Sequence, residues 1–145
     1  MPAWISFSIY DGLGSIPHFD DSADIPPEVM DLRKQLVDAG GIFICTPEYA
    51  FGVPGTLKNA LDWTVGSGEF DGKPVALITA STGGEKAHAS LLLTLKAINA
   101  HVDEGATLLI SFIRSKLNEK KEISDPATLD SIKEVIAALI NTIEE

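Results

Sequence analysis

Three short apolar runs, each followed by a helical pattern, constrain the fold of this chain more than any other feature of its sequence. The runs cover residues 41–46, 73–81 and 105–113. They are apolar at successive positions, which is typical of strands that are covered on both faces. Strands that alternate with helices pair in parallel. The sequence therefore predicts an α/β fold, with a parallel sheet and helices on both of its sides.

The remaining elements follow from residue type and periodicity. A fourth strand is expected at Trp4–Tyr10, "WISFSIY", which is aromatic and β-branched. The first expected helix has Pro27 in its first turn and Gly40 as its C-cap. The four expected helices cover 27–41, 53–65, 84–102 and 125–143, and the first two carry apolar stripes of Val29, Leu32, Leu36 and Val37 and of Leu57, Leu61 and Val65.

Size, charge and cysteine content narrow the class of protein. The 145 residues suit a single domain, 1–145, which can bury roughly 68–70% of its unfolded surface. A net charge of −10 argues against a nucleic-acid partner. No apolar run approaches the roughly 18 residues of a membrane span. One cysteine, Cys45, excludes an internal disulfide and predicts the cytoplasm. It is expected to be a small core residue.

Ligands of such sheets bind at the carboxyl ends of the strands, so the loops that follow the apolar runs are the candidate sites. "TPEYAFGVPG", residues 46–55, combines two prolines and two glycines with the flat side chains of Tyr49 and Phe51. A rigid loop of this kind presents backbone N–H groups beside apolar surface, which suits a planar heterocycle. A well-packed turn from strand to helix remains the alternative.

The loop "TASTGGEK", residues 79–86, places small residues directly before a helix. Small residues allow a ligand to approach the backbone, and the helix dipole favours negative charge. A plain N-cap by Ser81 or Thr82 is the alternative interpretation. Two such loops on neighbouring strand tips are more informative than either one alone.

"TPEYAFGVPGTLKNALDW" followed by "FDGKPVALITASTGG" resembles the NADPH-dependent FMN reductase family of flavodoxin-like folds. That family shows a Pro-Glu-Tyr-Asn turn, then Pro-Gly-x-Leu-Lys-Asn-Ala-x-Asp-Trp, and then a "GKP" strand that ends in a Ser/Gly loop. The resemblance extends from Trp4 over nearly the whole chain, and "YDGLGSIPHFD" also resembles the stretch after the family's second strand.

The resemblance implies a three-layer flavodoxin-like sandwich, the cofactors FMN and NADPH, and a dimer or tetramer with the Leu57–Trp63 helix near an interface. It implies hydride transfer through FMN to a quinone, azo, metal-oxyanion or flavin acceptor. The expected cofactor-binding residues are Pro47, Glu48, Tyr49, Ala50, Phe51 and Gly52 on the first loop and Ser81, Thr82, Gly83 and Gly84 on the second. No catalytic side chain is expected, because the flavin carries the hydride.

Two departures from the family pattern bear on function. Ala50 replaces the usual Asn of the turn, and Ala disfavours left-handed backbone. The family's opening strand, phosphate loop and first helix, about 30 residues by the size of a βαβ unit, have no counterpart in this sequence. Residues 1–10 contain no glycine, Arg or Lys that would replace them. Without three or four phosphate hydrogen bonds, FMN affinity is expected to fall by roughly 5–10 kcal/mol.

A shortened sheet of about four strands is therefore expected. The absent strand would lie between those at 4–10 and 41–46, so its loss leaves a gap of roughly 9–10 Å. Three outcomes are open: the Trp4 strand pairs with 41–46, it pairs with another subunit, or it stays poorly ordered. The first is preferred. Loss of the first helix uncovers one face of the sheet, which favours oligomers.

Other candidate sites are weaker. His18, His88 and His101 lack the spacing of metal ligands, and "HFDDSAD" is interpreted as a solvated acidic loop rather than a cation site. Ser81 is not in a Gly-x-Ser-x-Gly elbow, which disfavours a hydrolase. The alternative to the reductase is a non-catalytic flavodoxin-like remnant or oligomerisation partner that does not retain FMN.

Overall fold

A parallel sheet of three strands, in the order β1-β2-β3, organises the computed structural model, which describes residues 2–145. The elements in chain order are η1 (Leu13–Ser15), α1 (Pro27–Asp38), β1 (Ile42–Thr46), α2 (Gly55–Val65), β2 (Val75–Ala80), α3 (Glu85–Ala97), η2 (Glu104–Ala106), β3 (Thr107–Ile110), η3 (Ile113–Lys116) and α4 (Pro126–Glu144).

The central strand, β2, has a partner on each side. Ile44 of β1 is in register with Leu77, and Leu77 is in register with Thr107 of β3. The side chains from Val75 to Thr79 are all buried. A parallel strand that is buried on both faces reads as a continuous apolar run, as expected for this segment.

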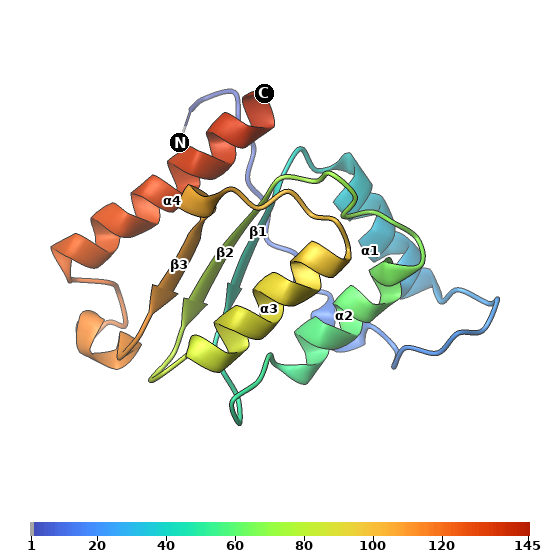
Figure 1. Cartoon of the computed structure of the whole chain (residues 1–145), viewed down its shortest axis with the longest axis horizontal. Helices are drawn as coiled ribbons and strands as arrows, with labels where there is room; N and C mark the ends of the chain where they lie inside the picture. The colour runs from blue at the N-terminus through green and yellow to red at the C-terminus, as the bar shows by residue number, and fades with distance from the viewer. Residues whose placement is uncertain (1) are drawn as a thin grey trace.

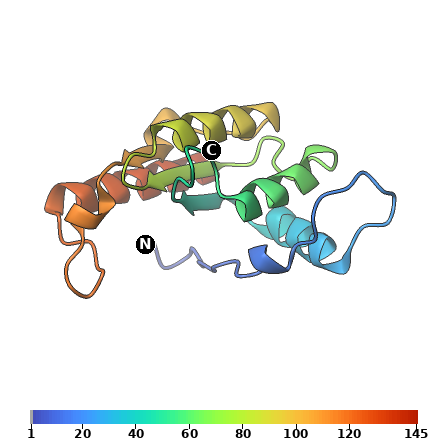
Figure 2. The same ribbon diagram turned by 90° about the horizontal axis from the view of Figure 1, so that it is seen from below.

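Helices cover the two faces of the sheet unequally. One apolar cluster joins Ile44 and Leu77 to Leu91 of α3 and includes Leu61 of α2. On the other face, Ile78 packs with Val135 and Leu139 of α4. Figures 1 and 2 show α3 on one side of the sheet and the N-terminal segment on the other. The predicted α/β fold, with a parallel sheet between helices, is confirmed.

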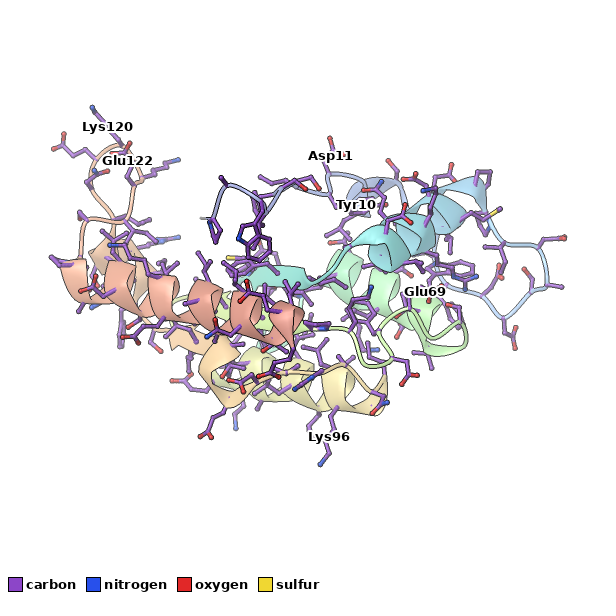
Figure 3. The ribbon with its side chains drawn as sticks, turned by 90° about the horizontal axis from the view of Figure 1, so that it is seen from above. Tyr10, Asp11, Glu69, Lys96, Lys120 and Glu122 are labelled. Carbon is purple, nitrogen blue, oxygen red and sulfur yellow. The ribbon has the colours of Figure 1, made fainter. Side chains whose placement is uncertain are left out.

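A third cluster fixes α1 beside α2. Val29 and Leu32 of α1 pack with Trp63 of α2, and Arg33 lies 3.4 Å from the carboxylate of Glu69. Figure 3 shows Tyr10 where the N-terminal segment approaches α1. Burial and the carboxylates of Asp31 and Asp11 raise the pKa of Tyr10, in agreement with a position beside α1.

The predicted strand at Trp4–Tyr10 is wrong. These residues form no strand, and β1 pairs with β2 alone in the sheet of the described residues. The preferred pairing of this segment with 41–46 is therefore also wrong. Strand propensity reflects packing and pairing with neighbours, so a suitable sequence forms no strand without a ladder partner. The side chains of Phe7 and Ile9 are exposed.

Several local predictions also need correction. Val37 and Val65 are exposed, because each lies at the end of its helix, beyond the packed face. Ala39, not Gly40, caps α1, by donating its N–H to the carbonyl of Gln35. The third strand is shorter than 105–113, because a 3-10 turn lies on each side of it. Cys45 is exposed, because α4, which covers this side of the sheet, packs mainly on β2 and β3.

No helix in residues 2–145 is both long enough and apolar enough to cross a membrane.

Candidate functional site

The two loops singled out in the sequence leave the same edge of the sheet. All three strands point in one direction, and the segments after β1 and β2 meet at the lower edge in Figure 1. Parallel strands bring the loops at their carboxyl ends together, which is where ligands of such sheets bind.

The loop after β1 contains a tight turn with left-handed backbone. Tyr49 and Gly52 exchange two backbone hydrogen bonds, of 3.0 and 2.9 Å. Ala50 and Phe51 between them have φ values of 49° and 61°. Positive φ at both central residues is the geometry of a type I′ turn. A non-glycine residue in this region costs of order 1–3 kcal/mol, so the turn is strained.

The strained turn presents two aromatic side chains to solvent. Tyr49 is 66% and Phe51 is 80% exposed. Contact of such large apolar groups with water is unfavourable in free energy. Pro47, Glu48 and Gly52 around them are half-buried. The turn therefore offers flat apolar surface on a fixed support, which is the arrangement that a planar ring requires.

The loop after β2 is packed rather than open. Gly84 is buried and has a φ of 105°, and a Cβ at this position would lie 2.7 Å from Leu109. Ser111 donates a hydrogen bond of 3.0 Å to the carbonyl of Gly83. The backbone N–H of Phe112 donates to the carbonyl of Thr82. Contacts from the end of β3 thus hold Thr82, Gly83 and Gly84 in place.

Glu48 joins the two loops. Its carboxylate accepts hydrogen bonds from the backbone N–H groups of Gly84, at 3.2 Å, and Ala87, at 2.9 Å. Its own N–H donates to Oγ of Ser81, at 3.3 Å. Ser81 and Thr82 therefore do not cap α3, which was the alternative interpretation of this loop. Of the expected site residues, these contacts bring together Glu48, Ser81 and Gly84.

Three supporting residues near the loops were not singled out in the sequence for this role. Oγ1 of the fully buried Thr79 lies 2.8 Å from Nδ1 of His88 on α3. Desolvation lowers the pKa of His88, which favours the neutral ring. Ser111 is the third, through its contact with Gly83. The Ser111 contact joins segments 28 residues apart in the chain, and the Thr79–His88 contact joins β2 to the helix that follows it. Neither residue spacing nor residue type predicted these contacts.

The remaining candidates gain no support as sites. In the part of the chain that the structure describes, no three His, Cys, Asp or Glu side chains could hold a metal ion. Although Cys45 is exposed, the atoms packed around its thiol partly desolvate it and raise its pKa, which makes it a poor nucleophile at neutral pH. Two surface hollows, of about 310 and 360 Å³, are lined by no residue of 47–52 or 81–84: one lies around Thr128, and the other lies between Trp63 and the acidic stretch at Asp20 and Asp21.

The family model for the NADPH-dependent FMN reductases matches residues 5–114. The chain belongs to this family. Membership implies an NAD(P)H-dependent flavin oxidoreductase with FMN and NAD(P)H as cofactors, as the resemblance of the two loops predicted. The match includes both loops of the site.

Individual relatives agree with the family. The chain is 40% identical over 87 residues to a 2-hydroxy-1,4-benzoquinone reductase of a Burkholderia species, covering 57% of this chain and 47% of that protein. It is 32% identical to the quinone reductase of Escherichia coli, over 90% of this chain and 75% of the relative. The chain thus spans about half of the first relative and three quarters of the second.

The fold comparison gives the same architecture. The flavoenzyme NAD(P)H:(acceptor) oxidoreductase FerB of Paracoccus denitrificans superposes with a TM-score of 0.70 at 26% identity, covering 91% of this chain and 77% of that one. This confirms the predicted flavodoxin-like fold in a shortened form. The three strands described here are one fewer than the four expected.

The residues of the site fit one end of FMN better than the other. The type I′ turn with Tyr49 and Phe51 suits the isoalloxazine ring, because it combines flat apolar groups with a fixed backbone. The start of α3 does not fit the phosphate, because the carboxylate of Glu48 already accepts from the N–H groups of Gly84 and Ala87. A phosphate there would also meet like charge.

Proposed function

We propose that this protein is an NAD(P)H-dependent flavin oxidoreductase that uses FMN to reduce a small acceptor, a quinone first among the quinone, azo, metal-oxyanion and flavin classes. Benzoquinone and quinone reductases are among its relatives. The observation that carries the proposal is the strained turn with two exposed aromatic side chains, held against the start of α3 by Glu48.

The proposed binding residues are those expected from the sequence. Pro47, Glu48, Tyr49, Ala50, Phe51 and Gly52 would line the ring on one side, and Ser81, Thr82, Gly83 and Gly84 would line its pyrimidine edge. When bound, FMN supplies the chemistry, because it accepts a hydride from the nicotinamide and passes two electrons to the acceptor.

The residues of this chain would bind the flavin ring and orient it. Tyr49 and Phe51 would stack on the ring, and their fixed turn lowers the entropic cost of doing so. The small residues of the second loop would allow close approach to the backbone. Because the ring carries the hydride, no side chain of this chain is proposed as a proton donor or nucleophile.

A second candidate is a non-catalytic scaffold or oligomerisation partner that does not retain FMN. The use of the α3 N-terminus by Glu48 favours it, because the phosphate then needs another site. The net charge of −10 does not attract a phosphate either. Ring affinity and phosphate affinity therefore have to be measured separately.

The test is a fluorescence titration of the chain with FMN and with riboflavin, which lacks the phosphate, followed by NADPH oxidation with 1,4-benzoquinone. The proposal predicts that riboflavin binds and that the double substitution Tyr49→Ala, Phe51→Ala weakens it at least about 10-fold. Phe7→Ala, which removes another exposed aromatic side chain outside the site, is the control. A folded chain that binds neither ligand and oxidises no NADPH supports the scaffold instead.

The other expectations stay predictions. They comprise a single domain over residues 1–145, a homo-oligomer of two or four copies with the Leu57–Trp63 helix near an interface, and the cytoplasm. Sedimentation of the chain at several concentrations tests the oligomer, which mass action makes concentration-dependent.

A further inference from the structure

Helix α3 receives its N-terminal cap from outside the helix. Gly84 at the N-cap position has no side chain to accept from the first turn. It also cannot be replaced easily by a capping residue, because its φ is 105° and a Cβ would lie 2.7 Å from Leu109. Ser, Thr, Asp or Asn normally fills this role. The cap therefore has to come from another segment.

Glu48 supplies that cap. One carboxylate oxygen accepts from Gly84 N–H and the other accepts from Ala87 N–H, across 36 and 39 residues of sequence. Ala87 is the third residue of α3, which is the position that a conventional N-cap side chain reaches. A carboxylate at this end of a helix is also favoured by the helix dipole.

The cap ties α3 to the turn that carries the aromatic side chains. Tyr49 follows Glu48 directly in the chain, and the N–H of Glu48 itself donates to Oγ of Ser81. The three hydrogen bonds of Glu48 therefore join the loop after β1 to the loop after β2 and to the first turn of α3. Rigid support of this kind determines how well a binding site is pre-organised.

We propose that Glu48 is a positioning residue, which holds the turn of Tyr49 and Phe51 at a set place relative to Ser81–Gly84 by capping α3 with its carboxylate. The effect of Glu48 on ring affinity rests on the proposed function. The coupling of the two loops is a property of this chain alone and does not depend on any ligand.

Glu48→Gln is the sharpest test, because it keeps shape and removes one acceptor. Its amide NH₂ would face a backbone N–H, so one of the two cap bonds is lost and two donors oppose each other. The matched control is Glu85→Gln, which removes a negative charge from the same first turn of α3. The control keeps both cap bonds and so isolates the charge effect.

The first measurement is amide hydrogen exchange followed by NMR, without ligand. In Glu48→Gln, exchange of Ala87 N–H and of Gly52 N–H, which closes the aromatic turn, should accelerate together by about 10-fold, in line with the loss of a cap. In Glu85→Gln both should stay within about twofold of the native chain. Acceleration at Ala87 with no change at Gly52 would overturn the coupling.

The second measurement is riboflavin affinity at a temperature where both variants are folded. We expect about 10-fold weaker binding in Glu48→Gln and less than about twofold in Glu85→Gln. Unchanged binding in a folded Glu48→Gln chain would overturn the positioning role. If the native chain binds no riboflavin, the proposed function fails, and the exchange measurement still decides whether Glu48 couples the loops.

Discussion

Strands β1 and β2 have similar sequences and different surroundings. Both are short apolar runs, "IFICT" and "VALITA", and they pair in parallel along five residues. In β2 every residue from Val75 to Thr79 is buried, whereas in β1 only Ile44 and Thr46 are. An apolar run thus shows that a segment is a strand of a parallel sheet, but it does not show that both faces are covered.

The loops that follow these strands differ in the same sense. The loop after β2 is packed against β3, with a buried glycine at the helix start. The loop after β1 exposes its aromatic side chains and holds two non-glycine residues in left-handed backbone. Packing fixes the loop after β2, and a strained turn fixes the loop after β1. Strain held in an exposed segment is a common mark of a binding site.

The largest effect should come from a pair of substitutions on one row of the sheet. Ile78 and Cys45 are in register, but Ile78 is 3% exposed and packs on α4, whereas Cys45 is exposed. Ile78→Ala should cost about 2–5 kcal/mol of unfolding free energy through the cavity that it leaves. Cys45→Ala should change it by less than about 0.5 kcal/mol. Urea unfolding measures both, and equal losses would mean that the Cys45 face is covered in solution.

A smaller effect should come from the strained turn. Ala50→Asn places a residue that tolerates left-handed backbone at a φ of 49°. It should raise the unfolding free energy by about 1 kcal/mol. Ala89→Asn is the control, because Ala89 lies inside α3, where Asn is a poorer helix former than Ala. Thermal unfolding distinguishes them, and a loss of stability in Ala50→Asn would show that the turn is not strained in solution.

The smallest effect should be on the pH dependence of stability, through His88, which contacts Thr79 of β2. The pKa of His88 is lowered from 6.5 by desolvation, so between the two values the unfolded chain binds more protons than the folded one. Its contribution is complete above pH 6.5 and is lost as the pH falls below that value. In His88→Gln this part of the pH dependence should disappear, whereas His101→Gln at an exposed position should keep it. Unfolding midpoints measured between about pH 5 and 8 compare the two.

Much of this molecule followed from its sequence. Apolar runs and helical periodicity placed β1, β2, α2 and α4 within two residues of their bounds, because these patterns reflect which faces a segment buries. The helix expected over 84–102 begins as expected but ends at Ala97. Trp4–Tyr10 has the composition of a strand and forms none, because pairing requires a partner edge that composition does not report. The same limit explains why Cys45 is exposed and not buried as expected. Whether a strand residue is buried depends on the element that packs over it and not on its own segment.

For the site, the sequence by itself determined which residues lie on the two loops and the family to which they belong, because motif and spacing are local. Only the tertiary structure decided that Glu48, and not Ser81 or Thr82, caps α3. It also placed Ser111 and His88 behind the second loop. The contacts of Glu48 and Ser111 join segments 28 to 39 residues apart in the chain. The register of a parallel sheet, which brings these segments together, is a property of the whole fold.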